Sequence, residues 1–332
     1  MSKSELQKWA EEKGESVGFE SEKNIYQANY YETGQVRNVI LAGTFRGEPA
    51  VLKAYDDPRT TDEPELLKEF HRINKSDRLT APRLHEYEMV TPEQGWFIME
   101  MLPKEAVPFR SPLPREERNN FLEAFREYRR NFPSTPTREL TLEEKLSAPE
   151  YHDHRINTWL KLASNKEQEE YWAGRGKVLD MEDFLPRYQK GMQALRRVFQ
   201  EREMVWCHGH VKPKEIFQVP GENIMYLTDF AHAKMYPEGY ELAFIIWADH
   251  IMEADWQRDY SEWRQGIFDW IEDIKPVAEE LGIKDFDNFF PYCLLERVLG
   301  TILADVCASN KPRQEKEKRL DLLFQLFDEL MA

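Results

Sequence analysis

A change in hydrophobic pattern near residue 103 constrains the fold of this chain more than any other feature. Before it, runs rich in β-branched and aromatic residues alternate with turn residues, at 24–31, 36–45, 49–55, 83–90 and 95–102. Such runs joined by short turns predict an antiparallel sheet. After it, apolar residues recur three or four positions apart, which is helical spacing. The pattern therefore predicts a strand-rich first part and a helical second part.

One helix interrupts the predicted strands, at residues 62–76. Leu66, Leu67, Phe70 and Ile73 recur at helical spacing, and Asp62 stands where an N-cap is expected. Later helices are predicted at 115–132, 142–163, 181–200 and from residue 240 onward, with short strands at 204–207, 215–219 and 223–230. A chain of 332 residues is also longer than one core usually holds. We predict an α+β fold with two lobes: a small antiparallel sheet with one helix at 1–103, and a mainly helical lobe at 104–332.

Composition and charge argue against several classes of function. The formal net charge of −16 argues against a nucleic-acid partner and would suit a cationic substrate. No apolar run approaches the roughly 20 residues that a membrane span needs, and residues 1–16 lack the apolar stretch of a secretory signal. The 3 cysteines form no CxxC pair. We expect a cytoplasmic protein with no membrane or nucleic-acid partner.

Two charged residues of the first part are candidates for nucleotide binding. Lys53 alternates with apolar residues in "AVLKAY", so its side chain points to one face of the sheet. A cation in that place is what phosphoryl transfer from a nucleotide requires. Glu69 lies at the edge of the apolar stripe on the following helix. We therefore predict an ion pair between Lys53 and Glu69.

The stretch "HGHVKPKEI", residues 208–216, carries the most specific signal. It resembles the loop "HGDLKPENI" of the kinase-like phosphotransferases, the family of aminoglycoside phosphotransferases, choline kinases and fructosamine kinases. Two functional positions differ. The resemblance places His210 where the family has the aspartate that orients the acceptor hydroxyl, and Glu215 where it has an asparagine that binds magnesium. It also makes Lys212 a catalytic candidate.

Two further elements extend the resemblance. In "YLTDFAHA", Asp229 takes the place of the family's magnesium-binding aspartate, and in "GYELAFIIW", Glu241 takes that of the acid that anchors the catalytic loop. His232 is expected to have no role. The segment "MEMLPKE" matches the hinge, where Glu100 and Leu102 are expected to contact the nucleotide. The resemblance covers about residues 20 to 250.

The two substitutions leave the activity open. Imidazole can accept a proton near neutral pH and act as a general base, and a glutamate carboxylate is a good ligand for Mg²⁺. The resemblance then implies an ATP-dependent phosphotransferase that uses Mg²⁺ and acts on a hydroxyl of a cationic or sugar-like small molecule, with catalytic His210, Lys212 and Asp229 and metal ligands Glu215 and Asp229. The choice between ATP and GTP stays open.

Two alternatives remain at this stage. The first is a catalytically impaired pseudokinase that binds nucleotide or a protein partner. The second is a kinase fold that carries out other chemistry with the nucleotide, such as nucleotidyl transfer.

Overall fold

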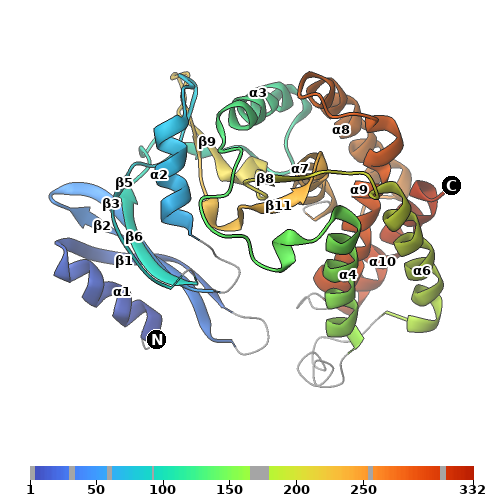
Figure 1. The fold of residues 1–332 in the computed structure, drawn as a ribbon, viewed down its shortest axis with the longest axis horizontal. Coiled ribbons are helices and arrows are strands. Elements are labelled where there is room, and N and C mark those ends of the chain that lie inside the picture. Colours follow the sequence, from blue (N-terminus) through green and yellow to red (C-terminus); the bar gives the residue numbers. More distant parts are fainter. Residues whose placement is uncertain are drawn as a thin grey trace.

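The computed structural model describes residues 4–29, 34–57, 62–91, 93–164, 179–252, 257–306 and 312–332. Within these ranges a sheet occupies one end of the molecule and helices fill the other (Figure 1). This is the two-lobe α+β arrangement that the sequence predicts. No helix in these ranges has both the length and the apolar character needed to cross a membrane.

The first lobe is built on a five-stranded antiparallel sheet with the order β1-β2-β3-β6-β5. Its strands are β1 (Phe19–Asn29), β2 (Val36–Phe45), β3 (Glu48–Asp56), β5 (Leu84–Thr91) and β6 (Gln94–Glu100). The five predicted strands are confirmed, although the first begins earlier than expected. Residues 30–33, which include the end of that predicted strand, lie outside the described ranges.

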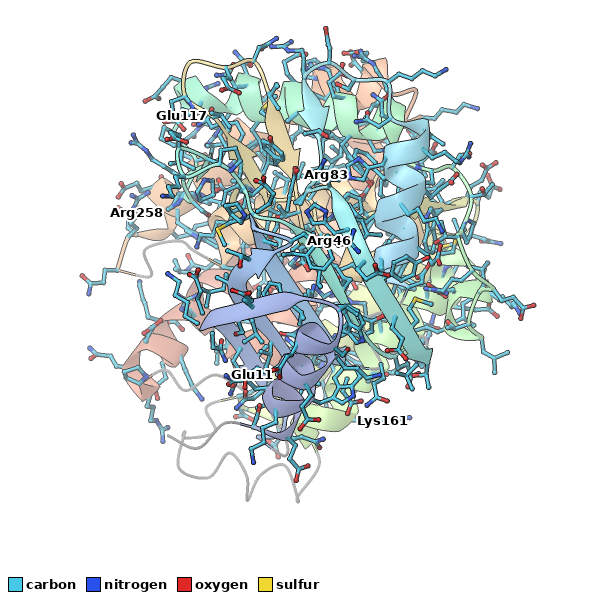
Figure 2. The ribbon with its side chains drawn as sticks, turned by 90° about the vertical axis from the view of Figure 1, so that its left-hand side faces the viewer. Glu11, Arg46, Arg83, Glu117, Lys161 and Arg258 are labelled. Carbon is cyan, nitrogen blue, oxygen red and sulfur yellow. The ribbon has the colours of Figure 1, made fainter. Side chains whose placement is uncertain are left out.

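Successive side chains of β3 point to opposite faces of the sheet, and each face packs against a different part of the molecule. Leu52 and Ala54 join a core with Val39 and Ile98, and helix α1 (Glu5–Ser16) covers this face through Ala10. Lys53 points to the opposite face because successive side chains of a strand alternate. Figure 2 views the molecule from this end, with Glu11 labelled on α1. The sequence did not predict α1, so the lobe has a second helix besides the expected one, α2 (Glu63–Ile73).

The second lobe is mainly helical, as predicted. Its helices are α3 (Arg115–Asn131), α4 (Ala148–Ser164), α6 (Met181–Val198), α7 (Tyr240–Ile246), α8 (Tyr260–Glu280), α9 (Phe286–Gly300) and α10 (Arg313–Leu330). Single turns of 3-10 helix lie at Glu143–Lys145, Pro213–Glu215 and Phe230–His232, and π-helical segments at Trp247–Ile251 and Thr301–Val306. Large aromatic side chains such as Phe121, Trp263 and Trp270 fill the core.

Short strands join the two lobes close to the predicted site. A four-stranded sheet has the order β4-β10-β9-β7, with β4 (Leu79–Thr80), β10 (Met225–Leu227), β9 (Ile216–Gln218) and β7 (Val107–Pro108). The β9–β10 hairpin lies between the loop and Asp229. Because β4 follows α2 in the chain and pairs with β10, α2 is tied to the hairpin that carries Asp229. Strand β8 (Met204–Cys207) precedes this hairpin in the chain and β11 (Lys234–Pro237) follows it, and these two strands pair with each other.

Candidate active site

The loop after β8 is held by a buried histidine. His208 is fully buried, its ring Nε2 donates to the Thr228 carbonyl at 3.0 Å, and its backbone N–H donates to the Tyr128 hydroxyl at 2.8 Å. Burial lowers the pKa of His208 to about 3, so the ring is neutral at physiological pH. His208 therefore supports the loop and is not available as a proton carrier.

Glu241 anchors the same loop, as the sequence predicts. Its Oε1 accepts from the Gly209 backbone N–H at 3.1 Å and from the Tyr128 hydroxyl at 2.7 Å, while its Oε2 pairs with Arg129 at 3.1 Å. Gly209 has φ of +73°, and a Cβ there would lie 2.4 Å from Tyr236 Cε2. Glycine is needed at this position both for its conformation and for the missing side chain.

His210 follows and turns its ring toward Asp229. The His210 Nδ1 lies 2.8 Å from Asp229 Oδ2, although this close approach lacks the alignment of a hydrogen bond. The other ring nitrogen, Nε2, lies 3.4 Å from the Lys212 amino group. Phe244 packs against the ring, with centroids 5.1 Å apart. The ring thus bridges the Asp229 carboxylate and a lysine.

Lys212 and Glu215 complete the loop. Lys212 Nζ lies 3.1 Å from Glu215 Oε1, and that oxygen lies 3.8 Å from His210 Nδ1. The Thr228 hydroxyl donates to the Glu215 carbonyl at 3.0 Å, which ties the loop to the strand before Asp229. The structure therefore brings together His210, Lys212, Glu215 and Asp229, the four residues predicted from the loop and the following strand.

Asp229 has a strained backbone and a stabilised charge. Its φ of +61° is uncommon for a residue other than glycine, and such strain clusters at functional sites. Burial favours the neutral acid, but His232, His210 and Lys53 outweigh it and hold the pKa of Asp229 well below its usual range. Asp229 is therefore ionised at neutral pH.

Lys53 reaches the site from β3, but its partner differs from the prediction. Lys53 Nζ lies 2.6 Å from Glu63 Oε2 and 3.7 Å from Asp229 Oδ1. Burial opposes its charge, but the Glu63 and Asp229 carboxylates outweigh burial and raise the pKa of Lys53. The lysine is a cation held between α2 and Asp229.

The predicted ion pair between Lys53 and Glu69 is wrong. Glu69 instead binds the Arg72 guanidinium through two hydrogen bonds of 2.6 Å on the exposed face of α2. The helical period indicates that Glu63 is buried. One buried stripe, with the spacing i, i+3, i+4, i+7, consists of Glu63, Leu66, Leu67 and Phe70. A carboxylate inside an apolar stripe needs a buried cation, and Lys53 supplies it.

Two other expectations near the site have different outcomes. Asp62 does stand at the N-cap of α2, but its side chain makes no cap hydrogen bond and pairs with Arg138 at 2.9 Å. Glu100 and Leu102 lie half-buried at the end of β6 and just after it. Their contact with a nucleotide stays a prediction.

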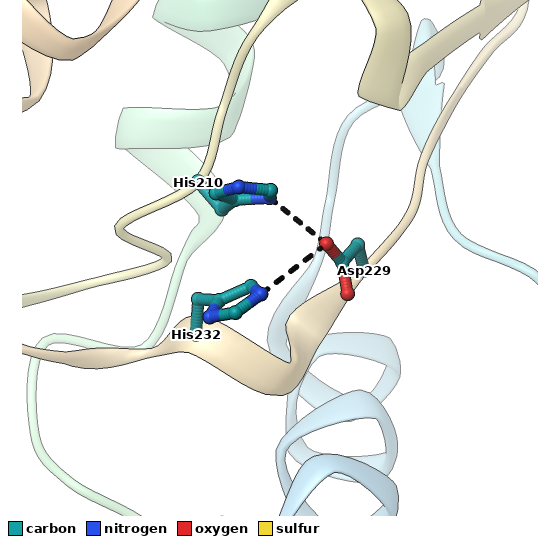
Figure 3. Close-up of side chains that lie close together, drawn as sticks. All are labelled: His210, Asp229 and His232. Atoms are coloured by element: carbon teal, nitrogen blue, oxygen red, sulfur yellow. Dashed lines mark ion pairs between the residues drawn. The ribbon is translucent and has the colours of Figure 1, made fainter. Parts of the chain in front are cut away.

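His232, which was expected to have no role, belongs to the site. Its Nε2 lies 3.6 Å from Asp229 Oδ2, and its ring centroid lies 4.2 Å from that of His210 (Figure 3). Burial and nearby positive charge lower the pKa of His232 to about 3 despite the Asp229 carboxylate. The 3-10 turn Phe230–His232 brings this ring back to Asp229. The sequence does not predict this turn.

Comparison with known proteins decides the family. Residues 33–281 match the family model described as the phosphotransferase enzyme family. The chain belongs to this family. The predicted resemblance to kinase-like phosphotransferases is thereby confirmed, and no curated protein matches the chain in sequence.

Solved structures of phosphotransferases share the whole fold. An aminoglycoside phosphotransferase, APH(4)-Ia, has a TM-score of 0.55 at 12% identity, covering 98% of this chain and 97% of its own. The microcompartment-associated aminopropanol kinase has a TM-score of 0.56 at 10% identity, covering 95% and 94%. Choline kinase LicA from Streptococcus pneumoniae has a TM-score of 0.52 at 12% identity, covering 97% and 98%. At such identities these likenesses show the fold, which is the predicted bilobal protein-kinase-like one.

Proposed function

We propose that this chain is an ATP-dependent phosphotransferase that transfers the γ-phosphoryl group to a hydroxyl of a small molecule. One observation carries the proposal: Lys53, Asp229 and His210 form a continuous series, with separations of 3.7 Å and 2.8 Å. A cation for the phosphates, a carboxylate for their metal ion and a group beside the acceptor are the parts that this chemistry requires.

Relatives of the same fold support the use of a nucleotide. Structures of aminoglycoside phosphotransferase APH(4)-Ia variants hold ADP or AMP-PNP with hygromycin B, and a spectinomycin phosphotransferase holds ADP with spectinomycin. In this chain the buried Lys53–Glu63 pair presents the lysine next to Asp229. We infer that the nucleotide phosphates bind there, with Glu100 and Leu102 beside the base.

A magnesium ion fits the residues present. Asp229 and Glu215 both approach His210 Nδ1, at 2.8 Å and 3.8 Å, so two carboxylates border one place, and carboxylate oxygens suit Mg²⁺. We infer that these two residues hold the metal. When bound, the ion neutralises charge on the phosphate oxygens.

His210 orients the acceptor in this proposal. The Lys212 ammonium group can only donate hydrogen bonds, so in its contact with His210 the ring Nε2 is the acceptor. The ring proton is then on Nδ1, which faces Asp229. When Lys212 turns to a phosphate, the Nε2 lone pair is free to accept from a hydroxyl. This tautomer is the one that a general base needs.

Aromatic contacts favour a sugar-like acceptor over a cationic one. The rings of Tyr240, Phe244 and Trp247 surround the Arg297 guanidinium, whose central carbon lies 4.5, 4.7 and 5.0 Å from their centroids. Phe244 in turn packs on His210. Because this cluster already holds a cation, it is closed to a substrate ammonium, and we propose a neutral hydroxyl compound as acceptor.

The lobe boundary is part of the same proposal. The Met101 backbone N–H donates to the Pro49 carbonyl at 3.2 Å, which is a last contact with the sheet before the chain leaves β6. We therefore place the hinge at Glu100–Pro103, between a nucleotide-binding lobe at 1–103 and an acceptor-binding lobe at 104–332.

The test separates binding from transfer. Melting temperature is measured with and without Mg·ATP, and ADP release is then followed with a panel of sugars and amino alcohols. We expect ATP to raise the melting temperature by mass action and a sugar-like acceptor to stimulate ADP release, with both effects lost in Lys53→Met. A thermal shift without transfer to any acceptor would favour the impaired pseudokinase, and no shift with any nucleoside triphosphate would contradict nucleotide binding.

A further inference from the structure

Two histidines and an aspartate converge on one point beside Lys53. His210 Nδ1 and His232 Nε2 lie 2.8 Å and 3.6 Å from the same oxygen, Asp229 Oδ2 (Figure 3). One atom from each of the three residues lies within 4.8 Å of the others, a separation at which they can ligate one cation. Lys53 approaches Oδ1, the other carboxylate oxygen, and leaves Oδ2 to the two rings.

Packing holds this arrangement in place. The left-handed backbone of Asp229 leads directly into the 3-10 turn that returns His232 to it. The His210 ring packs near both His232 and Phe244, with centroid separations of 4.2 Å and 5.1 Å. Glu215 Oε1, 3.8 Å from His210 Nδ1, adds a carboxylate next to the same point.

The donor atoms decide which ion such a site prefers. Mg²⁺ prefers oxygen ligands, whereas imidazole nitrogen suits first-row transition metals, and two histidines with one carboxylate are a recurring ligand set for those metals. We propose that His210, Asp229 and His232 form a site that binds a first-row transition-metal dication, such as Mn²⁺ or Co²⁺, in preference to Mg²⁺.

This inference rests on the proposed function, because in a phosphotransferase the ion would accompany the nucleotide. Three protein ligands leave coordination positions open, and phosphate oxygens can fill them. Binding through Nδ1 moves the imidazole proton of His210 to Nε2. The form with this ion therefore differs from the form without it: Nε2–H of His210 donates a hydrogen bond to the acceptor oxygen, whereas in the ion-free site Nε2 accepts from the hydroxyl.

Metal titration of the nucleotide-free protein tests the site without relying on activity. CoCl₂ is added to the full chain and followed by the visible absorption of bound Co²⁺, with parallel calorimetric titrations of MnCl₂ and MgCl₂. We expect one ion per chain, and affinities for Co²⁺ and Mn²⁺ at least about tenfold above that for Mg²⁺. Equal affinities, or tighter binding of Mg²⁺, would overturn the inference.

A pair of variants locates the binding. His232→Gln removes one nitrogen ligand and is expected to weaken Co²⁺ binding by about tenfold or more, with little change for Mg²⁺. The control, His154→Gln, replaces an exposed histidine on α4. Equal loss in both variants, or loss in neither, would place Co²⁺ elsewhere and overturn the inference. If circular dichroism shows that His232→Gln does not fold, the wild-type comparison of Co²⁺ with Mg²⁺ still decides.

Phosphoryl transfer is scored separately with ATP and each metal. Selective, His232-dependent Co²⁺ binding without transfer would support the site and contradict the proposed function. Transfer with Mg²⁺ but no selective Co²⁺ binding would contradict the site and leave the proposed function standing.

Discussion

Glu63→Gln is the change that probes the proposed nucleotide-binding lobe most sharply. The Lys53–Glu63 contact is 2.6 Å long, and the two side chains are only 7% and 5% exposed. Removing one partner of a buried ion pair leaves an uncompensated charge, which costs about 3–5 kcal/mol. Glutamine keeps one acceptor oxygen, and Asp229 at 3.7 Å still compensates the lysine in part. We therefore expect a loss of about 2–4 kcal/mol in the free energy of unfolding, near the range for a hydrogen bond to a charged group.

A matched control lies on the same helix. Glu69→Gln makes the same chemical change, but Glu69 pairs with Arg72, whose side chain is 70% exposed. Pairs exposed to solvent contribute little to stability. We therefore expect Glu69→Gln to alter neither the urea midpoint nor the thermal shift with Mg·ATP appreciably.

Urea unfolding and nucleotide-dependent melting, measured on both variants, give the comparison. Glu63→Gln should be less stable and should show a smaller shift with Mg·ATP, because Lys53 is no longer held toward Asp229. Equal effects of the two variants on nucleotide binding would show that the position of Lys53 does not depend on Glu63.

Three further predictions concern the loop and the core. Gly209→Ala should abolish transfer while nucleotide binding persists, because the new Cβ meets Tyr236 at 2.4 Å; a kinetic assay showing full activity would contradict this. Glu241→Gln weakens the contact with Arg129 and the loop, so steady-state kinetics should show a lower kcat with little change in ATP affinity, and an unchanged kcat would count against the anchor role. His152 is buried, and burial lowers its pKa, so the unfolded chain binds a proton that the folded chain does not. Stability should therefore fall as pH drops below about 6.5, by at most about 1.4 kcal/mol per pH unit from this group, and urea unfolding of His152→Gln should show a flatter pH dependence; an equal slope would rule out this source.

Local patterns made much of the site predictable. The sequence predicts Lys53, His210, Lys212, Glu215 and Asp229 as candidate site residues because each stands within a short strand or loop that its neighbouring residues identify. The strands of the first lobe could be predicted equally well, since turn residues and the alternation of apolar with polar residues are local signals.

The misses have physical causes. The sequence does not single out Glu63 because a negative charge in the first turn of a helix commonly favours the helix dipole, although its place on the apolar stripe indicates burial. The position of the His232 ring depends on the left-handed backbone conformation of Asp229. That conformation cannot be predicted from the residue type alone. Helix α1 fully buries only Ala10 and Gly14, and Leu6 and Trp9 are partly buried, so its apolar period is weak.

A crystal structure of the complex with Mn²⁺ and a non-hydrolysable ATP analogue would show whether Lys53, Asp229 and His210 together form the nucleotide site. We expect the triphosphate alongside Lys53, anomalous density for the metal at Asp229, and the His210 ring facing the open side of the γ-phosphate. A nucleotide bound away from Lys53, or a triphosphate with its metal remote from Asp229, would contradict this prediction.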